Sequence, residues 1–397
     1  MLPKVCLKRG KEESLLRRHP WIFSGAVEYI EADREPEEGI VVDVCTKQGA
    51  FIARGHYQIG SIAVRVLTFE NEAIDASWWQ RRIAAAYDVR RLLGLTDSAG
   101  TTCYRLVHGE GDSLPGLIVD IYGTTAVMQC HSVGMYRSRR EIAEALLALY
   151  GEHLTAIYDK SAQTVPYKAG LQAVDGYLYG RTEPATQVVL ENGHRFLVNW
   201  EEGQKTGFFI DQRFNRELVG RYAAGRTVLN TFSYTGGFSV YAMAGGAREV
   251  VSVDASEKAV RLADENMRLN FGDDVRHTAL AADAVEYLKE LEPRYDLIIL
   301  DPPAFAKHHK VLGNALQGYK RINARALARI RPGGILFTFS CSQAVSPQLF
   351  RTTVFSAAAI AGRKVRILHQ LTQPADHPID IYHPEGEYLK GLVLYVE

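Results

Sequence analysis

The chain has 397 residues, of which 47% are hydrophobic and 23% are charged, a balance typical of soluble globular proteins with two or three domains. Its formal net charge is zero, which excludes a global basic field and limits any nucleic-acid surface to a local patch. Five scattered cysteines show neither a CxxC pair nor a metal-ligand spacing, so we expect a reducing compartment and no metal site. Neither a secretory signal nor a membrane-spanning apolar run is found, and we therefore expect a cytoplasmic protein.

Residues 1–75 are predicted to form a small β-barrel or sandwich. Short strand-like runs at 39–44, 49–55 and 62–68 are separated by turn residues, without a long helix between them.

The first thirty residues are locally basic, with six Lys or Arg against three Glu. Cations there lie next to an aromatic ring, a combination that can contact phosphate and stack on a base. The alternative is a solvated turn with a tryptophan in the core. The candidate RNA-binding residues are Lys8, Arg17, Arg18, His19 and Trp21.

Residues 76–185 are predicted to form a central α+β domain. Helical patterns cover 76–95 and 141–150. Strand patterns cover 104–107, 117–122, 126–130 and 156–159. A polar stretch at Thr182-Glu183-Pro184 indicates the boundary with the next domain.

From residue 186 to 397 strands alternate with helical patterns, which predicts an α/β domain with a doubly wound, mostly parallel sheet. A loop rather than a helix joins the final two strands, so we expect the last strand to run antiparallel in a seven-stranded mixed sheet. The predicted strands are 226–231, 249–254, 276–281, 295–301, 334–340, 365–370 and 389–396.

The first two strands of this domain end in a pattern typical of a cofactor site, because ligands bind beyond the carboxyl ends of such strands. The first ends in a glycine turn at 230–237, and the second ends in Asp254, which can accept hydrogen bonds from ribose hydroxyls. The turn lacks the G-x-G-x-x-G that holds a pyrophosphate, which favours S-adenosylmethionine over a nucleotide or an empty Rossmann-like scaffold. The candidate cofactor-binding residues are Asn230, Phe232, Tyr234, Thr235, Gly236, Asp254, Ala255, Asp283, Ala284 and Asp301.

The fourth strand ends in Asp301-Pro302-Pro303, a stiff turn because proline fixes φ and lacks an N–H donor. Asp301 can face a planar base, and Phe305 can stack on it. The alternative is a turn that merely terminates the strand.

Cys341 lies just past the fifth strand, which is predicted to neighbour the strand of Asp301. A free cysteine is often only a small buried hydrophobe, as we expect for the other four. At a strand end beside Asp301 it is a candidate nucleophile, with Ser340 and Ser342 as polar neighbours. His377, in the loop between the last two strands, is a candidate to approach the same site.

With these motifs the chain resembles the bacterial large-subunit ribosomal RNA cytosine-5 methyltransferases that carry an N-terminal PUA domain. The resemblance covers nearly the whole chain. It is carried by segments 14–26, 109–116, 205–213, 232–238, 301–303, 339–342 and 375–378.

The resemblance implies a PUA barrel, a central α+β domain and a class I methyltransferase domain. It also implies that Cys341 adds to C6 of a cytosine in 23S ribosomal RNA while Asp301 binds the N3/N4 edge, and that C5 accepts a methyl group from S-adenosylmethionine. Lys205, Thr206 and Phe209 become cofactor-binding candidates.

The family often has a lysine directly after Asp-Pro-Pro, where this chain has Ala304, so Lys307 is the candidate substitute. Pro302, Pro303, Phe305, Lys307 and His377 complete the predicted substrate-binding set.

Three alternatives stay open: a methyltransferase acting on a guanine nitrogen, a non-catalytic ribosome-assembly factor that binds RNA, and an oxidoreductase. The oligomeric state, monomer or homodimer, is also open.

Overall fold

The computed structural model describes residues 2–166, 171–274, 276–305 and 311–397, and its internal contacts divide the chain into two units. The first comprises Met1–Val189, Val198–Ile210 and Ala375–Gly386. The second comprises Leu190–Leu197, Asp211–Pro374 and Glu387–Glu397. In these described ranges no helix is long and apolar enough to cross a membrane.

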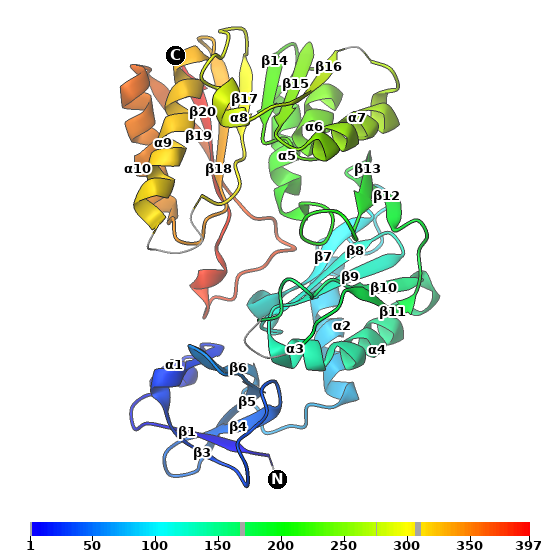
Figure 1. The fold of residues 1–397 in the computed structure, drawn as a ribbon, viewed down its shortest axis with the longest axis vertical. Coiled ribbons are helices and arrows are strands. Elements are labelled where there is room, and N and C mark those ends of the chain that lie inside the picture. Colours follow the sequence, from blue (N-terminus) through cyan, green and yellow to red (C-terminus); the bar gives the residue numbers. More distant parts are fainter. Residues whose placement is uncertain (1, 167–170, 275, 306–310) are drawn as a thin grey trace. The chain divides into compact units, whose positions relative to one another are not determined.

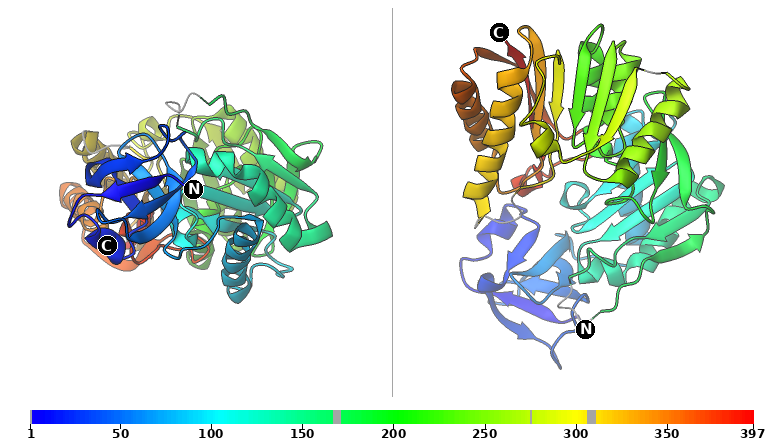
Figure 2. Two further views of the ribbon diagram at one scale, coloured as in Figure 1. Left: turned by 90° about the horizontal axis from the view of Figure 1, so that it is seen from below. Right: turned by 45° about the horizontal axis from the view of Figure 1, so that its top comes forward.

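The N-terminal part of the first unit is a six-stranded mixed sheet with the order β2-β6-β5-β4-β1-β3 (blue in Figure 2). Alternate side chains such as Val5, Val42 and Val64 are fully buried in its core, as expected for a sheet with one covered face. The expected strands β4–β6 are confirmed, and closure into a barrel stays a prediction. The elements are β1 (Lys4–Leu7), α1 (Glu13–Leu16), β2 (Trp21–Phe23), β3 (Val27–Glu31), β4 (Val41–Cys45), β5 (Phe51–Tyr57) and β6 (Ile62–Thr68).

A five-stranded sheet with the order β11-β10-β9-β8-β7 follows in the same unit. Asp75 caps the first helix by accepting a hydrogen bond from Trp78 N at 2.9 Å, and the fully buried Trp78 and Ile83 anchor that helix in the core. The elements are α2 (Ala76–Leu92), β7 (Cys103–His108), β8 (Leu117–Tyr122), β9 (Thr125–Cys130), α3 (Val133–Arg137), α4 (Arg139–Tyr150), β10 (Ala156–Asp159) and β11 (Gly176–Gly180).

A buried arginine ties the segment Ala375–Gly386 to this unit. The Arg90 guanidinium on α2 forms a two-pronged ion pair with Asp112, and its Nη2 also donates to the Asp376 carbonyl oxygen at 2.7 Å. The Asp376 carboxylate in turn accepts from Arg105 N at 3.1 Å. Arg90 is 0% exposed, so its charge depends on these partners for compensation.

Replacement of Arg90 by methionine should therefore destabilise the protein strongly. The Asp112 carboxylate would remain buried without its cation, which typically costs about 3–5 kcal/mol. Chemical denaturation monitored by circular dichroism measures the loss. Arg91→Met is the matched control, since Arg91 pairs with Asp88 on the exposed side of the same helix. Equal effects of the two substitutions would contradict the role assigned to Arg90.

The second unit is built on a seven-stranded sheet with the order β16-β15-β14-β17-β18-β20-β19. The first five of these strands are parallel to one another, and β20 runs antiparallel to both β18 and β19. The prediction of a seven-stranded mixed sheet whose last strand is antiparallel is confirmed. The strands are β14 (Thr227–Thr231), β15 (Glu249–Asp254), β16 (His277–Ala281), β17 (Leu297–Leu300), β18 (Gly334–Ser340), β19 (Val365–Thr372) and β20 (Lys390–Val396).

Helices cover both faces of this sheet, because neighbouring side chains of each strand point to opposite faces. Leu229 packs in the cluster formed with α8, α9 and α10, whereas Asn230 reaches Ser239 of α6 on the other face at 2.9 Å. Helices α9 and α10 lie side by side in Figure 1 and in the right view of Figure 2. The helices are α5 (Arg213–Tyr222), α6 (Gly237–Ala244), α7 (Glu257–Phe271), α8 (Ala284–Tyr287), α9 (Leu312–Arg329) and α10 (Pro347–Ala361).

A hairpin of β12 (Thr186–Glu191) and β13 (His194–Asn199), which the sequence did not predict, contains the boundary between the units. Its Glu191 is fully buried and pairs with Arg216 of α5 through two hydrogen bonds of 2.7 and 2.6 Å. This pair positions the start of α5 within the second unit.

Candidate active site

The turn after β14 has a backbone shaped by close packing. Phe232, Tyr234 and Gly236 have positive φ values of 55°, 45° and 75°. A Cβ on Gly236 would lie 2.9 Å from the Ala263 Cβ of α7, so only glycine allows this approach. Two non-glycine residues in the left-handed region store strain, a feature that clusters at ligand sites.

Asp254, at the end of β15, holds this turn. Its Oδ2 accepts from Tyr234 N at 2.8 Å and its Oδ1 accepts from Ser256 N at 2.9 Å. Each carboxylate oxygen has a second lone pair, so Asp254 can still accept hydrogen bonds from a diol.

Two polar atoms beside the same turn are buried without a hydrogen-bond partner among the described residues: Asn230 Oδ1 and Ser233 Oγ. Such atoms are costly to leave unsatisfied, and a bound ligand can supply their hydrogen-bond partners. The nucleoside part and amino group of S-adenosylmethionine carry the donors that these acceptors need, and the residues present fit that cofactor.

At the end of β16, Asp283 Oδ1 caps α8 by accepting from Val285 N and Glu286 N at 2.8 and 3.0 Å. Asp283 and Ala255 are exposed and Ala284 is buried. A contact of these three residues with the cofactor stays a prediction.

Asp301 follows β17, and a chain of amides orients its carboxylate. Gln212 Nε2 donates to Asp301 Oδ2 at 3.1 Å, and Asn215 Nδ2 donates to Gln212 Oε1 at 2.6 Å. Because Asn215 occupies the Gln212 oxygen, the Gln212 amide must turn its N–H groups toward Asp301. Burial and the neighbouring carboxylate of Asp211 raise the pKa of Asp301 to about 7, against the opposing effect of the Gln212 hydrogen bond.

Asp211 itself accepts a hydrogen bond from the Tyr388 hydroxyl at 2.7 Å. Sequence reasoning missed Asp211, Gln212, Asn215 and Tyr388 as site residues. In the sequence, segment 205–213 is informative only through its resemblance to a family. No local pattern shows that Gln212 reaches the end of a strand 89 positions away.

The Asp-Pro-Pro turn leads into the core. Pro302 is buried and Pro303 is exposed. The ring of Phe305 packs on the ring of Tyr319 in α9 with centroids 4.7 Å apart, and a Cβ on Gly318 would lie 3.0 Å from the Phe305 ring. Stacking of Phe305 on a base stays a prediction, and Lys307 lies outside the described residues.

Cys341 lies one residue beyond β18 and is partly exposed, whereas Cys6, Cys45, Cys103 and Cys130 are buried. Strands β17 and β18 are parallel neighbours, so Asp301 and Cys341 lie at the same edge of the sheet. The flanking Ser340 and Ser342 are fully buried. Ser342 Oγ is 3.0 Å from the Tyr319 hydroxyl oxygen.

Four residues predicted to bind the cofactor or the substrate belong to the first unit, whereas the strand ends described above belong to the second. They are Lys205, Thr206, Phe209 and His377. Thr206 is fully buried, where its hydroxyl donates to Asp120 and lies 2.8 Å from the Tyr122 hydroxyl oxygen. His377 is 1% exposed, with Nδ1 3.1 Å from Asp376 Oδ1. Binding of the cofactor by Lys205, Thr206 and Phe209, and of the substrate by His377, stays a prediction.

The N-terminal basic segment is engaged mostly in internal contacts. Trp21 Nε1 donates to Glu110 at 2.9 Å, and its ring packs edge-on against His383 at 4.3 Å. The Arg18 guanidinium lies 5.4 Å from the centre of the Phe69 ring. His19 Nε2 lies 3.8 Å from Glu385 Oε1, and Lys8 Nζ donates to the Gly25 oxygen at 2.9 Å.

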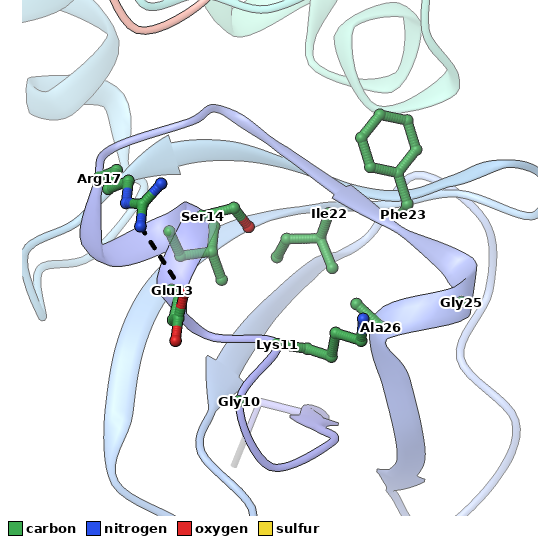
Figure 3. Close-up of a pocket in the computed structure, with 10 residues that line it drawn as sticks. Gly10, Lys11, Glu13, Ser14, Arg17, Ile22, Phe23, Gly25 and Ala26 are labelled. Atoms are coloured by element: carbon green, nitrogen blue, oxygen red, sulfur yellow. Dashed lines mark ion pairs between the residues drawn. The ribbon is translucent and has the colours of Figure 1, made fainter.

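A hollow of about 520 Å³ opens next to this segment, lined by Lys11, Ile22 and Phe23 among others (Figure 3). Arg17 lines it as well and makes an exposed 3.7 Å ion pair with Glu13. Exposed ion pairs of this kind contribute little to stability, so Arg17 can leave Glu13 and bind a phosphate.

Comparison with known proteins agrees with this architecture. Residues 169–388 match the model of an S-adenosylmethionine-dependent methyltransferase family, and residues 5–69 match that of a PUA-like domain. The ribosomal RNA large subunit methyltransferase I of Tolumonas auensis (strain DSM 9187 / NBRC 110442 / TA 4) is 44% identical over 400 residues, covering 99% of both chains. That of Klebsiella pneumoniae (strain 342) is 41% identical over 401 residues, covering 100% of this chain and 99% of the relative.

Solved structures of similar proteins cover the whole chain. A protein from Streptococcus mutans assigned as a SAM-dependent methyltransferase superimposes with a TM-score of 0.83 at 25% identity, covering 100% of both chains. A second solved structure, of a protein assigned as a methyltransferase in complex with SAH, gives a TM-score of 0.84 at 25% identity and the same coverage. The chain thus belongs to the family of PUA-domain-containing large-subunit ribosomal RNA methyltransferases, whose cofactor is S-adenosyl-L-methionine.

Proposed function

We propose that this protein methylates carbon 5 of a cytosine in large-subunit (23S) ribosomal RNA, with Cys341 as a covalent nucleophile. One observation carries the proposal: the one partly exposed cysteine of the five follows β18, at the same sheet edge as Asp301. The relatives named as ribosomal RNA large subunit methyltransferases support the choice of RNA.

Methylation of this carbon needs a thiol because C5 of cytosine is a poor nucleophile. In the proposed reaction the Cys341 thiolate forms a bond to C6, and the displaced electron pair makes C5 nucleophilic. S-adenosylmethionine, when bound, supplies the electrophilic methyl group. A water or carboxylate then takes the C5 proton, the C5–C6 double bond reforms, and Cys341 leaves as a thiolate.

Asp301 is proposed to bind the N3/N4 edge of the same base. A carboxyl with a pKa of about 7 is partly protonated at neutral pH, and the protonated form can donate to N3 as negative charge develops on the ring. The target cytosine must be unstacked to enter the site. Exposed Arg17, which lines the N-terminal hollow, is proposed to contact a phosphate of the RNA.

A guanine-nitrogen methyltransferase would need no thiol, because that nitrogen is already nucleophilic. A non-catalytic assembly factor would not need an oriented carboxylate or acceptors suited to a methyl donor. The products formed with and without Cys341 therefore separate these possibilities.

Mass mapping of ribosomal RNA tests the proposal directly. RNA from cells lacking this protein should lose one 5-methylcytosine of the large subunit, and the wild-type gene should restore it. A gene encoding Cys341→Ala should not. An unchanged 5-methylcytosine pattern, or the loss of a methylated guanine instead, would overturn the proposed base.

A further inference from the structure

Lys390 is a buried lysine close to the proposed nucleophile. It is the first residue of β20 and lies opposite Ser340 in the antiparallel pair with β18. Only 5% of its surface is exposed. Lysine is rarely buried to this extent unless its charge is compensated.

The Lys390 side chain runs alongside the residues around Cys341. From its position opposite Ser340, its Nζ reaches the carbonyl oxygen of Ser342, to which it donates at 2.6 Å. The side chain therefore spans the stretch of backbone that carries Cys341. An ammonium has three N–H donors, and this hydrogen bond uses one of them.

The charge of Lys390 and the charge of Cys341 affect each other. Burial lowers the pKa of Lys390 to about 8, while negative charge on Cys341 and on the exposed Glu387 acts in the opposite direction. Tyr319 also faces the thiol, and burial raises the pKa of this phenol, so it stays neutral. Lys390 is therefore still mainly an ammonium at neutral pH.

We propose that Lys390 is a positioning residue whose ammonium holds Cys341 as a thiolate. The inference deepens the proposed covalent function and rests on it for its biological meaning. A fixed cation next to a thiol lowers the free energy of the charged form, as in other reactive cysteine sites. Lysine acts here as a point charge on a long stem, which lets it reach the site from the neighbouring strand.

The same charge serves both halves of the reaction. When the S–C6 bond forms, negative charge leaves the sulfur for the ring; when that bond breaks, the charge returns to the sulfur. Lys390 keeps its proton throughout, and the C5 proton goes to another acceptor. The ammonium thus stabilises Cys341 as the attacking group and again as the leaving group.

Alkylation of Cys341 in the full-length protein without RNA provides the test. Iodoacetamide reacts with the thiolate, and peptide mass mapping separates Cys341 from the four buried cysteines. The wild-type reaction should titrate below the value of a free thiol, about 8.5. Lys390→Met should raise the midpoint by about one pH unit, which slows the reaction at neutral pH about tenfold. Lys390→Arg should keep the low midpoint.

Lys364→Met is the matched control, because Lys364 is exposed in the same unit and pairs with Glu397 at 3.2 Å. Identical pH profiles for wild type and Lys390→Met, with S-adenosylmethionine binding retained, would overturn the inference. If Lys390→Met does not fold, the pH profile of Cys341 alkylation in the wild type is the test. A titration midpoint at or above the free-thiol value contradicts a thiolate held by a cation. An unchanged 5-methylcytosine pattern in the RNA experiment would instead overturn the proposed function and leave the alkylation result standing.

Discussion

Replacing Cys341 with alanine is expected to abolish methylation of RNA while leaving S-adenosylmethionine binding intact. Loss of a covalent nucleophile in other enzymes lowers kcat by roughly 10⁴-fold or more. Cofactor affinity should persist because its proposed contacts, Asn230 in β14 and Asp254 at the end of β15, belong to other strands than β18. Transfer of labelled methyl groups to RNA measures the first effect, and calorimetry with S-adenosylmethionine measures the second.

Cys45→Ala is the control for the removal of a thiol, since Cys45 is buried in the six-stranded sheet of the other unit. It should retain full turnover. Undiminished turnover of Cys341→Ala with the same methylated product would exclude the covalent mechanism and favour methylation of a nitrogen. Loss of cofactor binding together with turnover would show instead that Cys341 supports the fold of the site.

Asp301→Asn is expected to lower methyl transfer by about 10² to 10⁴-fold, the usual contribution of a positioned acid or base. The same change should stabilise the protein above neutral pH. The pKa of Asp301 is raised from 3.8 to about 7, so between these values the folded state binds more protons than the unfolded state. Stability contributed by Asp301 therefore falls as the pH rises through this window. Asparagine removes that dependence.

Thermal unfolding of wild type and variant at pH 4 and pH 8 measures this difference. The midpoint of Asp301→Asn should exceed that of the wild type at pH 8, and the two should converge near pH 4. Asp273→Asn, which changes an exposed carboxylate in the same unit, should show no such gain. A variant that is less stable than wild type at pH 8 would contradict a carboxylate destabilised by burial and by Asp211. Asp211, Gln212 and Arg216 are the neighbours that act on this carboxylate.

The strands of the second unit were predictable because their signal is local. The run Leu297–Leu300 is entirely buried, and Gly334–Ser340 is buried at every position, as expected for strands covered on both faces. Once such strands alternate with helices, parallel pairing follows, and it brings Asp254, Asp301 and Cys341 to one edge. Short strands such as β1 and β2 lack that periodicity and were missed.

Hydrophobic periodicity acts over a few neighbouring residues, and it therefore indicates which segments form strands. The alternation of those strands with helices then predicts parallel pairing, and so the edge at which Asp301 and Cys341 lie. Contacts between distant segments depend on register and packing, which no local pattern records. Only the tertiary structure sets Gln212 against Asp301, pairs Glu191 with Arg216, and brings Lys390 to Ser342 across 48 positions of the chain. It also assigns Ala375–Gly386 to the first unit, because Arg90 needs the Asp376 carbonyl to satisfy a buried charge.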